Sequence, residues 1–287
     1  MRTITIFILL FIISNLASAQ NTILWSVRKP NSENTSYILG TFHQMGNSFI
    51  DDKPLIKKLL FEADLAIFES IEDRTEKIIQ VMLSRVPDSS YKEHLYQEDV
   101  DFLENYAKDW KIPLSQQKPG ELIVKLQQEY TKAYCGTIKE TDTSIHMDEY
   151  LISLAQAKQL KTAGLESDSI QFDAINRFHG EELTWGKTKE AIHQLVTDLQ
   201  DDKNKKQNCA FARQYLQMKF DYQFNLKCAE NNQLLTKRNE NWMPQIKSFI
   251  QKNRTVFIAV GMLHLYGECG IISQLRKDGY EVNPIKL

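Results

Sequence analysis

Two histidines follow glycines at the same spacing near opposite ends of the chain. The strings Tyr-Ile-Leu-Gly-Thr-Phe-His and Ile-Ala-Val-Gly-Met-Leu-His end at His43 and His264. In each, an apolar run typical of a buried strand ends at a glycine, Gly40 or Gly261. A glycine at that point lets the backbone turn sharply and approach a ligand closely. Because neutral imidazole is a common ligand of transition metals, the paired turns predict a metal site.

Two carboxylates stand at corresponding points of other candidate strands. Glu69 and Glu166 each stand at the end of a short candidate strand. In open α/β sheets, ligands bind beyond the carboxyl ends of the strands, so these residues should share an edge with the histidines. Two imidazoles with one or two carboxylates suit Mn²⁺, Co²⁺, Zn²⁺ or Fe²⁺. We therefore predict that His43, Glu69 and His264 bind one divalent metal ion, which would support hydrolysis.

The usual motifs of other hydrolases and of nucleotide-binding proteins do not occur. The sequence has no Gly-x-Ser-x-Gly, no His-Glu-x-x-His and no Gly-x-Gly-x-x-Gly. A single Gly-x-x-His has no diagnostic value, so the prediction depends on the repetition. The remaining histidines are predicted not to be ligands, with His146 the first alternative; they are His94, His146, His179 and His193.

The elements that must position these residues form two similar units. Each unit reads as a strand, the Gly-x-x-His turn, a helix and a second strand, and such a repeat is more informative than either copy. Crossovers of this kind give parallel strands. We expect strands at 23–27, 37–39 and 65–68 with a helix at 54–63, and strands at 255–260 and 280–285 with a helix at 271–277.

The middle of the chain, from about 72 to 251, has the apolar spacing of helices, interrupted by one short strand at 161–165. No low-complexity linker separates the pieces. We predict a single domain at 20–287 of the α/β (α+β) class, in which a central, mostly parallel sheet carries a large helical insertion. The expected helices span 74–83, 91–108, 120–134, 147–159, 180–199 and 209–228.

Residues 1–19 have the features of a secretory signal peptide. Arg2 precedes an apolar run, and Ala17-Ser18-Ala19 is a small-x-small cleavage site. We expect an exported protein, periplasmic or secreted, with no stable membrane anchor after cleavage. The precursor has 35 basic and 37 acidic side chains, and loss of Arg2 gives 34 − 37 = −3. That balance gives no electrostatic case for nucleic-acid binding.

The four cysteines are Cys135, Cys209, Cys228 and Cys269. No Cys-x-x-Cys pair occurs, so a zinc ribbon is not indicated. Export makes disulfides chemically permissible. Three pairings are possible and the sequence does not choose among them. Cys209 with Cys228 is the more local option, and we predict that these two can be bridged.

Several stretches across the mature chain match a known pattern. They are Leu24-Trp25, Ser36 to His43, Phe68-Glu69-Ser70, Met147 to Leu151, Gly164 to Ser167 with Gln171, Leu234 to Asn239 with Trp242, and Val260 to Leu265 with Gly267 and Gly270. The chain thereby resembles the TraB/GumN family, related to the Tiki metalloproteases. The most specific part is Arg-Asn followed by Val-Gly-x-x-His-Leu-x-Gly, which is hard to obtain by chance.

The resemblance implies two α/β repeats around a shared site, similar to erythromycin esterase-like and haem-uptake ChaN-like proteins. It implies a divalent-metal-dependent hydrolase, with metallopeptidase activity in the Tiki branch and a peptide or small-molecule substrate. Carried onto this chain, His43, Glu69 and His264 would bind the metal, and Glu166 and Arg238 would be catalytic. Glu166 would act as general base or fourth ligand, and Arg238 would neutralise charge on a substrate oxygen.

A non-catalytic envelope protein is the alternative. The same pocket could bind or sequester a small peptide, haem or a similar ligand without turnover, because one fold hosts many functions. A partner-binding protein with a relic site is a third possibility. Metal content after purification without a chelator separates the first two.

Overall fold

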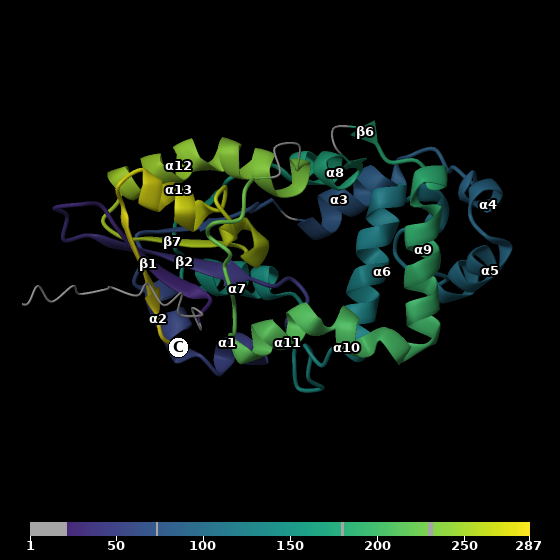
Figure 1. Ribbon diagram of the computed structural model, residues 1–287, viewed down its shortest axis with the longest axis horizontal. Helices are drawn as coiled ribbons and strands as arrows, with labels where there is room; N and C mark the ends of the chain where they lie inside the picture. The colour runs from purple at the N-terminus through teal and green to yellow at the C-terminus, as the bar shows by residue number, and fades with distance from the viewer. Residues whose placement is uncertain (1–21, 73, 179–180, 229–231) are drawn as a thin grey trace, which may run out of the picture.

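The computed structural model describes residues 22–72, 74–178, 181–228 and 232–287. The predicted signal peptide at 1–19 lies outside these residues. Within them, no helix has the length and apolar character needed to cross a membrane. The chain has the mixed α/β character that the sequence predicts, with a sheet at one end of the molecule and a helical part at the other (Figure 1).

The six-stranded sheet has the order β4-β3-β7-β2-β1-β8. All strands run in one direction except β1, which is antiparallel to both of its neighbours. The two predicted repeats are interleaved, because β7 of the second lies between β2 and β3 of the first. The strands are β1 (Leu24–Arg28), β2 (Thr35–Thr41), β3 (Leu65–Phe68), β4 (Thr162–Gly164), β7 (Val256–Gly261) and β8 (Glu281–Ile285).

Strand β7 is at the centre of the core. Its residues from Val256 to Val260 are all buried, as expected for a parallel strand covered by helices on both faces. Figure 1 shows α12 and α13 along one side of the sheet and α1, α2 and α7 along the other. These helices are α1 (Ser48–Asp51), α2 (Pro54–Phe61), α7 (Met147–Ala157), α12 (Arg238–Lys252) and α13 (Ile271–Lys277).

The helical insertion has an apolar cluster of its own, in which Leu103, Leu126 and Ile192 are completely buried. Phe42, inside the first Gly-x-x-His turn, packs against both this cluster and the core around the sheet. The insertion is therefore anchored at the turn that carries His43. Its helices are α3 (Arg74–Leu83), α4 (Tyr91–His94), α5 (Gln97–Tyr106), α6 (Pro119–Tyr134), α8 (Asp168–Ile175), α9 (Trp185–Gln200), α10 (Lys205–Asn208) and α11 (Ala210–Gln217).

Short elements join these helices. A small hairpin of β5 (Arg177–Phe178) and β6 (Glu181–Glu182) follows α8. The helical turns are η1 (Leu114–Gln116), η2 (Asp202–Asn204), the π-helical η3 (Gln233–Lys237) and η4 (Met262–Leu265).

Two predicted helices are shorter or divided. The helix predicted at 91–108 is α4 and α5, because Leu95 and Tyr96 between them are extended. The helix predicted at 180–199 begins only at Trp185, where the Thr184 side chain accepts a hydrogen bond from the Lys187 N–H. Such a cap satisfies a backbone donor that has no partner inside the helix.

The predicted helix at 209–228 is wrong in its second half. Helix α11 ends at Gln217, and Met218 adopts the left-handed conformation with φ 51°. Beyond it, Tyr222 is buried against Trp25, with ring centroids 5.0 Å apart, and its hydroxyl accepts a hydrogen bond from Trp25 Nε1 at 3.0 Å. The aromatic residues of this stretch therefore fill the core around the sheet from a non-helical segment.

The predicted bridge between Cys209 and Cys228 is wrong. The structure has the disulfides Cys135–Cys209 and Cys228–Cys269. The first joins the end of α6 to the start of α11, within the insertion. The chain then leaves the insertion at Met218 and packs against the sheet, which separates Cys228 from Cys209 and brings it to the loop after η4. Because the chain changes direction at Met218, the two cysteines that are nearest in sequence do not pair with each other.

Candidate functional site

The two Gly-x-x-His turns leave the same edge of the sheet side by side. Strands β2 and β7 are parallel neighbours, and Thr41 pairs with Gly261 where both strands end. His43 therefore follows one strand and His264 the adjacent one. The His43 side chain is 42% exposed, whereas His264 is buried in η4. The shared sheet edge that the sequence predicts for the two turns is thus present, with one accessible and one buried imidazole.

The two glycines permit a close approach between elements. A Cβ on Gly40 would lie only 2.9 Å from the Leu265 side chain and closer still to the sulfur of Met262, which belongs to the second turn. A Cβ on Gly261 would lie 3.1 Å from Glu69 Oε1. Neither glycine has a positive φ. Their role is therefore to leave space at the sheet edge. This space lets the two turns and Glu69 pack closely together.

The ring of His264 is held in one tautomer. Its Nδ1 lies 2.7 Å from Asn239 Oδ1. The Asn239 amide is itself oriented, because its Nδ2 donates to the carbonyls of His264 and Cys269 at 3.0 and 2.9 Å. The amide oxygen must then accept, so Nδ1 carries the proton and Nε2 carries the lone pair. Burial lowers the pKa of His264 to about 3, so the ring is neutral at pH 7.

His43 is oriented by a carboxylate. Its Nδ1 lies 2.5 Å from Asp148 Oδ2, and the other oxygen of Asp148 accepts a hydrogen bond from Thr41 Oγ1 at 2.6 Å. Burial alone would raise the pKa of Asp148, but the neighbouring His43 and the hydrogen bond from Thr41 outweigh it and lower this pKa. Asp148 is the first residue to which sequence reasoning gave no role, although it lies in a stretch that resembles the family.

Glu69 is a buried carboxylate surrounded by donors. Its Oε1 accepts the Gly261 N–H at 2.7 Å, and its Oε2 accepts from Gln171 Nε2 at 3.1 Å and from an Arg238 amine at 2.5 Å. Burial alone would raise the pKa of Glu69, but His264, Arg238 and the Gly261 N–H together hold it well below its usual range. Glu69 is therefore ionised at neutral pH.

Arg238, at the start of α12, joins the other polar residues into one cluster. Its guanidinium donates to Glu166 Oε1 at 2.7 and 2.9 Å as well as to Glu69. A third nitrogen lies 3.1 Å from His264 Nε2, whose lone pair accepts. The guanidinium also lies 4.6 Å from the ring of Trp242, one helical turn further along α12. Burial opposes its charge, but the two carboxylates outweigh this and raise the pKa of Arg238.

Glu166 has donors at both of its oxygens. Oε1 accepts from Arg238, and Oε2 accepts from Trp242 Nε1 at 2.9 Å. Its side chain is 4% exposed. A carboxylate held in this way orients the guanidinium.

The donor set suits a metal, although the ligands are not gathered around one point. Among the described residues, no three His, Cys, Asp or Glu side chains are positioned to hold a metal ion together. His264 Nε2 and Glu69 Oε1 are 3.9 Å apart, a separation that two bonds of about 2 Å to one ion span only when they are nearly in line. The Arg238 guanidinium contacts both groups. An ion bound there would replace its contact with His264 Nε2.

The structure thus brings four of the five predicted residues into direct contact and places His43 on the neighbouring turn. The four are Glu69, Glu166, Arg238 and His264. Sequence reasoning missed the supporting partners Asn239, Trp242, Gln171 and Asp148. The spacing of Arg238 and Trp242, four positions apart on one helix, was the available signal for a shared face.

Comparison with known proteins identifies the family of the chain. The family model described as TraB/PrgY/gumN matches residues 23–284, which include every residue of the cluster. No curated protein matches the chain. The match runs through both Gly-x-x-His turns, the sheet and the helical insertion, and so the chain belongs to the TraB/PrgY/gumN family.

Proposed function

We propose that this protein is an exported, divalent-metal-dependent hydrolase that acts on peptide bonds. The observation that carries the proposal is the orientation of the two imidazoles. Each has its Nδ1 against an oxygen acceptor, Asn239 for His264 and Asp148 for His43, which leaves the lone pair on Nε2. Metal-binding histidines are held in this way by a second partner that fixes their tautomer.

The residues that would hold the ion are His43, Glu69 and His264. Their types, two imidazoles and a carboxylate, match Mn²⁺, Co²⁺, Zn²⁺ or Fe²⁺. When bound, such an ion would lower the pKa of a water and polarise a carbonyl. The 42% exposure of His43 gives access to that side of the edge.

Arg238 supplies positive charge next to the same edge. It would stabilise negative charge on a substrate oxygen, because a buried guanidinium is a strong donor in a site with little water. Glu166 and Trp242 hold its position through hydrogen bonds and ring contact. In this proposal Glu166 is a positioning residue and Arg238 contacts the substrate.

Metal analysis tests the proposal. The full chain is purified without a chelator, its bound metals are measured, and Mn²⁺, Co²⁺ or Zn²⁺ is then titrated into it. We expect one ion per chain, loss of binding in His43→Ala and His264→Ala, and unchanged binding in His94→Ala, whose ring is exposed. The rate of peptide hydrolysis should rise with the amount of bound metal and should be lost in the variants that bind none. A folded protein that binds none of these ions would favour the non-catalytic binding protein.

We also propose export with cleavage after Ala19. The support is the order of Arg2, the apolar run and Ala17-Ser18-Ala19. Intact-mass measurement of the protein from the cell envelope and medium should give a chain that begins at Gln20. A mass that includes Met1 to Ala19 would contradict this proposal.

A further inference from the structure

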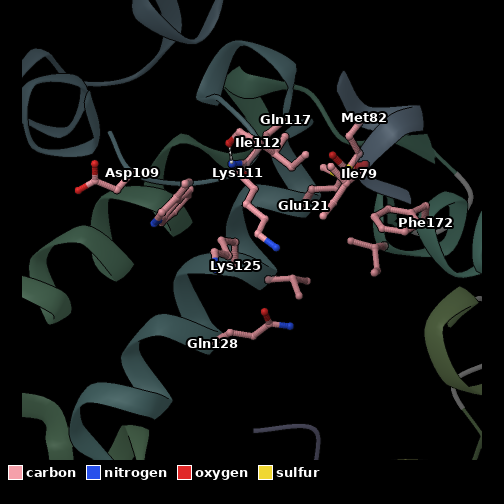
Figure 2. Close-up of a pocket in the computed structure, with 13 residues that line it drawn as sticks. Ile79, Met82, Asp109, Lys111, Ile112, Gln117, Glu121, Lys125, Gln128 and Phe172 are labelled. Atoms are coloured by element: carbon pink, nitrogen blue, oxygen red, sulfur yellow. Dashed lines mark hydrogen bonds between the residues drawn. The ribbon is translucent and has the colours of Figure 1, made fainter. Parts of the chain in front are cut away.

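A cavity of about 540 Å³ lies in the helical insertion, away from the residues of the polar cluster. Its volume is within the usual range of ligand pockets. Figure 2 shows Met82 and Phe172 at one end of it and Asp109 at the other, with Lys111 and Lys125 between them. Its walls come from α3, α6, α8 and the loop before η1, and most are apolar: Ile79, Met82, Trp110, Ile112, Val124, Phe172 and Ile175.

Helix α8 connects this cavity to the polar cluster. The Gln171 side chain donates to Glu69 Oε2 at 3.1 Å, and the next residue, Phe172, lines the cavity. Ile175, one helical turn further, also lines it. Since neighbouring Cα atoms are about 3.8 Å apart, the end of the cavity at Phe172 lies within the reach of a few extended residues from Glu69.

The polar groups of the cavity favour a peptide as its ligand over a simple hydrocarbon chain. Lys111, Lys125 and Gln128 can donate, whereas Asp109 and Gln128 can accept. A peptide backbone needs both kinds of partner, because it presents N–H and C=O groups in alternation. Glu121 adds no uncompensated charge, since its oxygens accept from Arg85, Asn176 and the Lys118 N–H.

We propose that this cavity is a substrate subsite that binds an extended peptide segment with bulky apolar side chains, a few residues from the bond that is cleaved. The proposal rests on the hydrolase function proposed above for its relation to cleavage, whereas binding in the cavity is testable by itself. The apolar walls take the side chains, and the amide and amine groups take the backbone. Helix α8 sets the distance to Glu69.

The test measures binding of a fluorescein-labelled hexapeptide with three central leucine or phenylalanine residues to the full chain, by fluorescence anisotropy. The comparison peptide has serine and glutamine at those positions. We expect the apolar peptide to bind at least ten times more tightly. Val124→Glu, which places a charge in the wall, and Val124→Trp, which fills the space, should each weaken its binding at least tenfold. Val124 is only partly buried, so both variants should fold.

Matched controls separate the cavity from the polar cluster. Gln127→Glu adds the same charge on the exposed face of α6 and should leave affinity within twofold of the parent protein. Glu69→Gln should keep peptide binding and lose hydrolysis. Equal affinity of the parent and Val124→Glu proteins, no binding of the apolar peptide at 1 mM, or tight binding of a fluorescent fatty acid in its place would each overturn the proposal.

The outcomes also distinguish this inference from the proposed function. Binding that depends on Val124, in a protein that cleaves no peptide with any added metal, supports peptide binding in the cavity and contradicts the hydrolase. Metal-dependent cleavage that is insensitive to apolar residues and to Val124→Glu supports the hydrolase and contradicts the subsite.

Discussion

Asn239 holds His264 through an Nδ1–H···Oδ1 hydrogen bond of 2.7 Å, and its own amide is fixed by two backbone carbonyls. One helix residue thus decides which ring nitrogen of a strand-end histidine can accept. The two residues are 25 positions apart in sequence, and the contact exists because α12 lies against the turn after β7.

Replacement of Asn239 should therefore act on metal affinity. We expect Asn239→Ala to weaken binding of Co²⁺ or Zn²⁺ roughly 10- to 100-fold, the usual effect of losing an orienting partner of a ligand. Asn241→Ala, an exposed change on the same helix, should have no effect. Isothermal titration of the metal checks both, and unchanged affinity in Asn239→Ala would contradict the orienting role.

Removal of Arg238 should strongly destabilise the fold. Arg238→Met leaves Glu69 and Glu166 buried without their common cation, and breaking a buried ion pair in this way costs about 3–5 kcal/mol. Arg28→Met removes an exposed pair with Glu281 and should cost less than about 1 kcal/mol. Urea unfolding measures both, and a loss below about 1 kcal/mol in Arg238→Met would show that the buried cluster is dispensable.

Stability should depend on pH through His264. Burial lowers its pKa to about 3 in the folded state, against about 6.5 in the unfolded chain. The unfolded chain therefore binds a proton first as pH falls. The contribution of His264 is fully present above about pH 6.5 and is lost towards pH 3. Glu69 adds a loss only below its ordinary value of 4.5, because its folded pKa is lowered further.

Chelator-treated protein should accordingly lose up to roughly 1.4 kcal/mol per pH unit between pH 6.5 and 4.5 from this one group. His264→Gln should have a shallower slope over that interval, and His94→Gln should keep the slope of the parent. Urea unfolding at four pH values gives the slopes. The same slope in His264→Gln and the parent would assign the pH dependence to other residues.

The two disulfides should differ in their effect on the site. Cys228→Ser removes the bond to Cys269, whose carbonyl accepts from Asn239, so it should lower both stability and metal affinity. Cys135→Ser removes the bond within the insertion and should lower stability alone, with each loss about 2–5 kcal/mol. Metal titration and urea unfolding separate them, after non-reducing peptide mapping has confirmed the pairs. Equal metal affinity in both variants would contradict a link between the Cys228–Cys269 bond and the position of Asn239.

The sequence was sufficient to predict the sheet edge and the turns. A short run such as β7, rich in β-branched residues and ended by a glycine, favours a buried strand, and the repeated Gly-x-x-His placed both histidines at strand ends. The family resemblance added Arg238. The sequence could not show that this residue lies between two carboxylates, because that contact depends on how α12 packs, 169 positions from Glu69.

Contacts made by helices were harder to predict than strand ends. Asn239 and Asp148 read as ordinary helix residues, and only the packing of α12 and α7 against the edge gives them histidine partners. The error at Cys209 and Cys228 has a similar origin. Local apolar spacing continued through Met218, where the chain in fact turns and leaves the helix.

The position of β7 has a consequence for the order of folding. This central strand pairs with β2 and β3, yet it lies near the end of the chain, and Tyr37 pairs with Phe257 across 220 positions. A chain that stops before Val256 lacks the middle of its sheet and leaves β2 and β3 without a common neighbour. Closing such a long loop is slow. The core around the sheet must therefore stay incomplete until synthesis is nearly finished, whereas the apolar cluster of the insertion, whose residues all precede Val256, can form earlier.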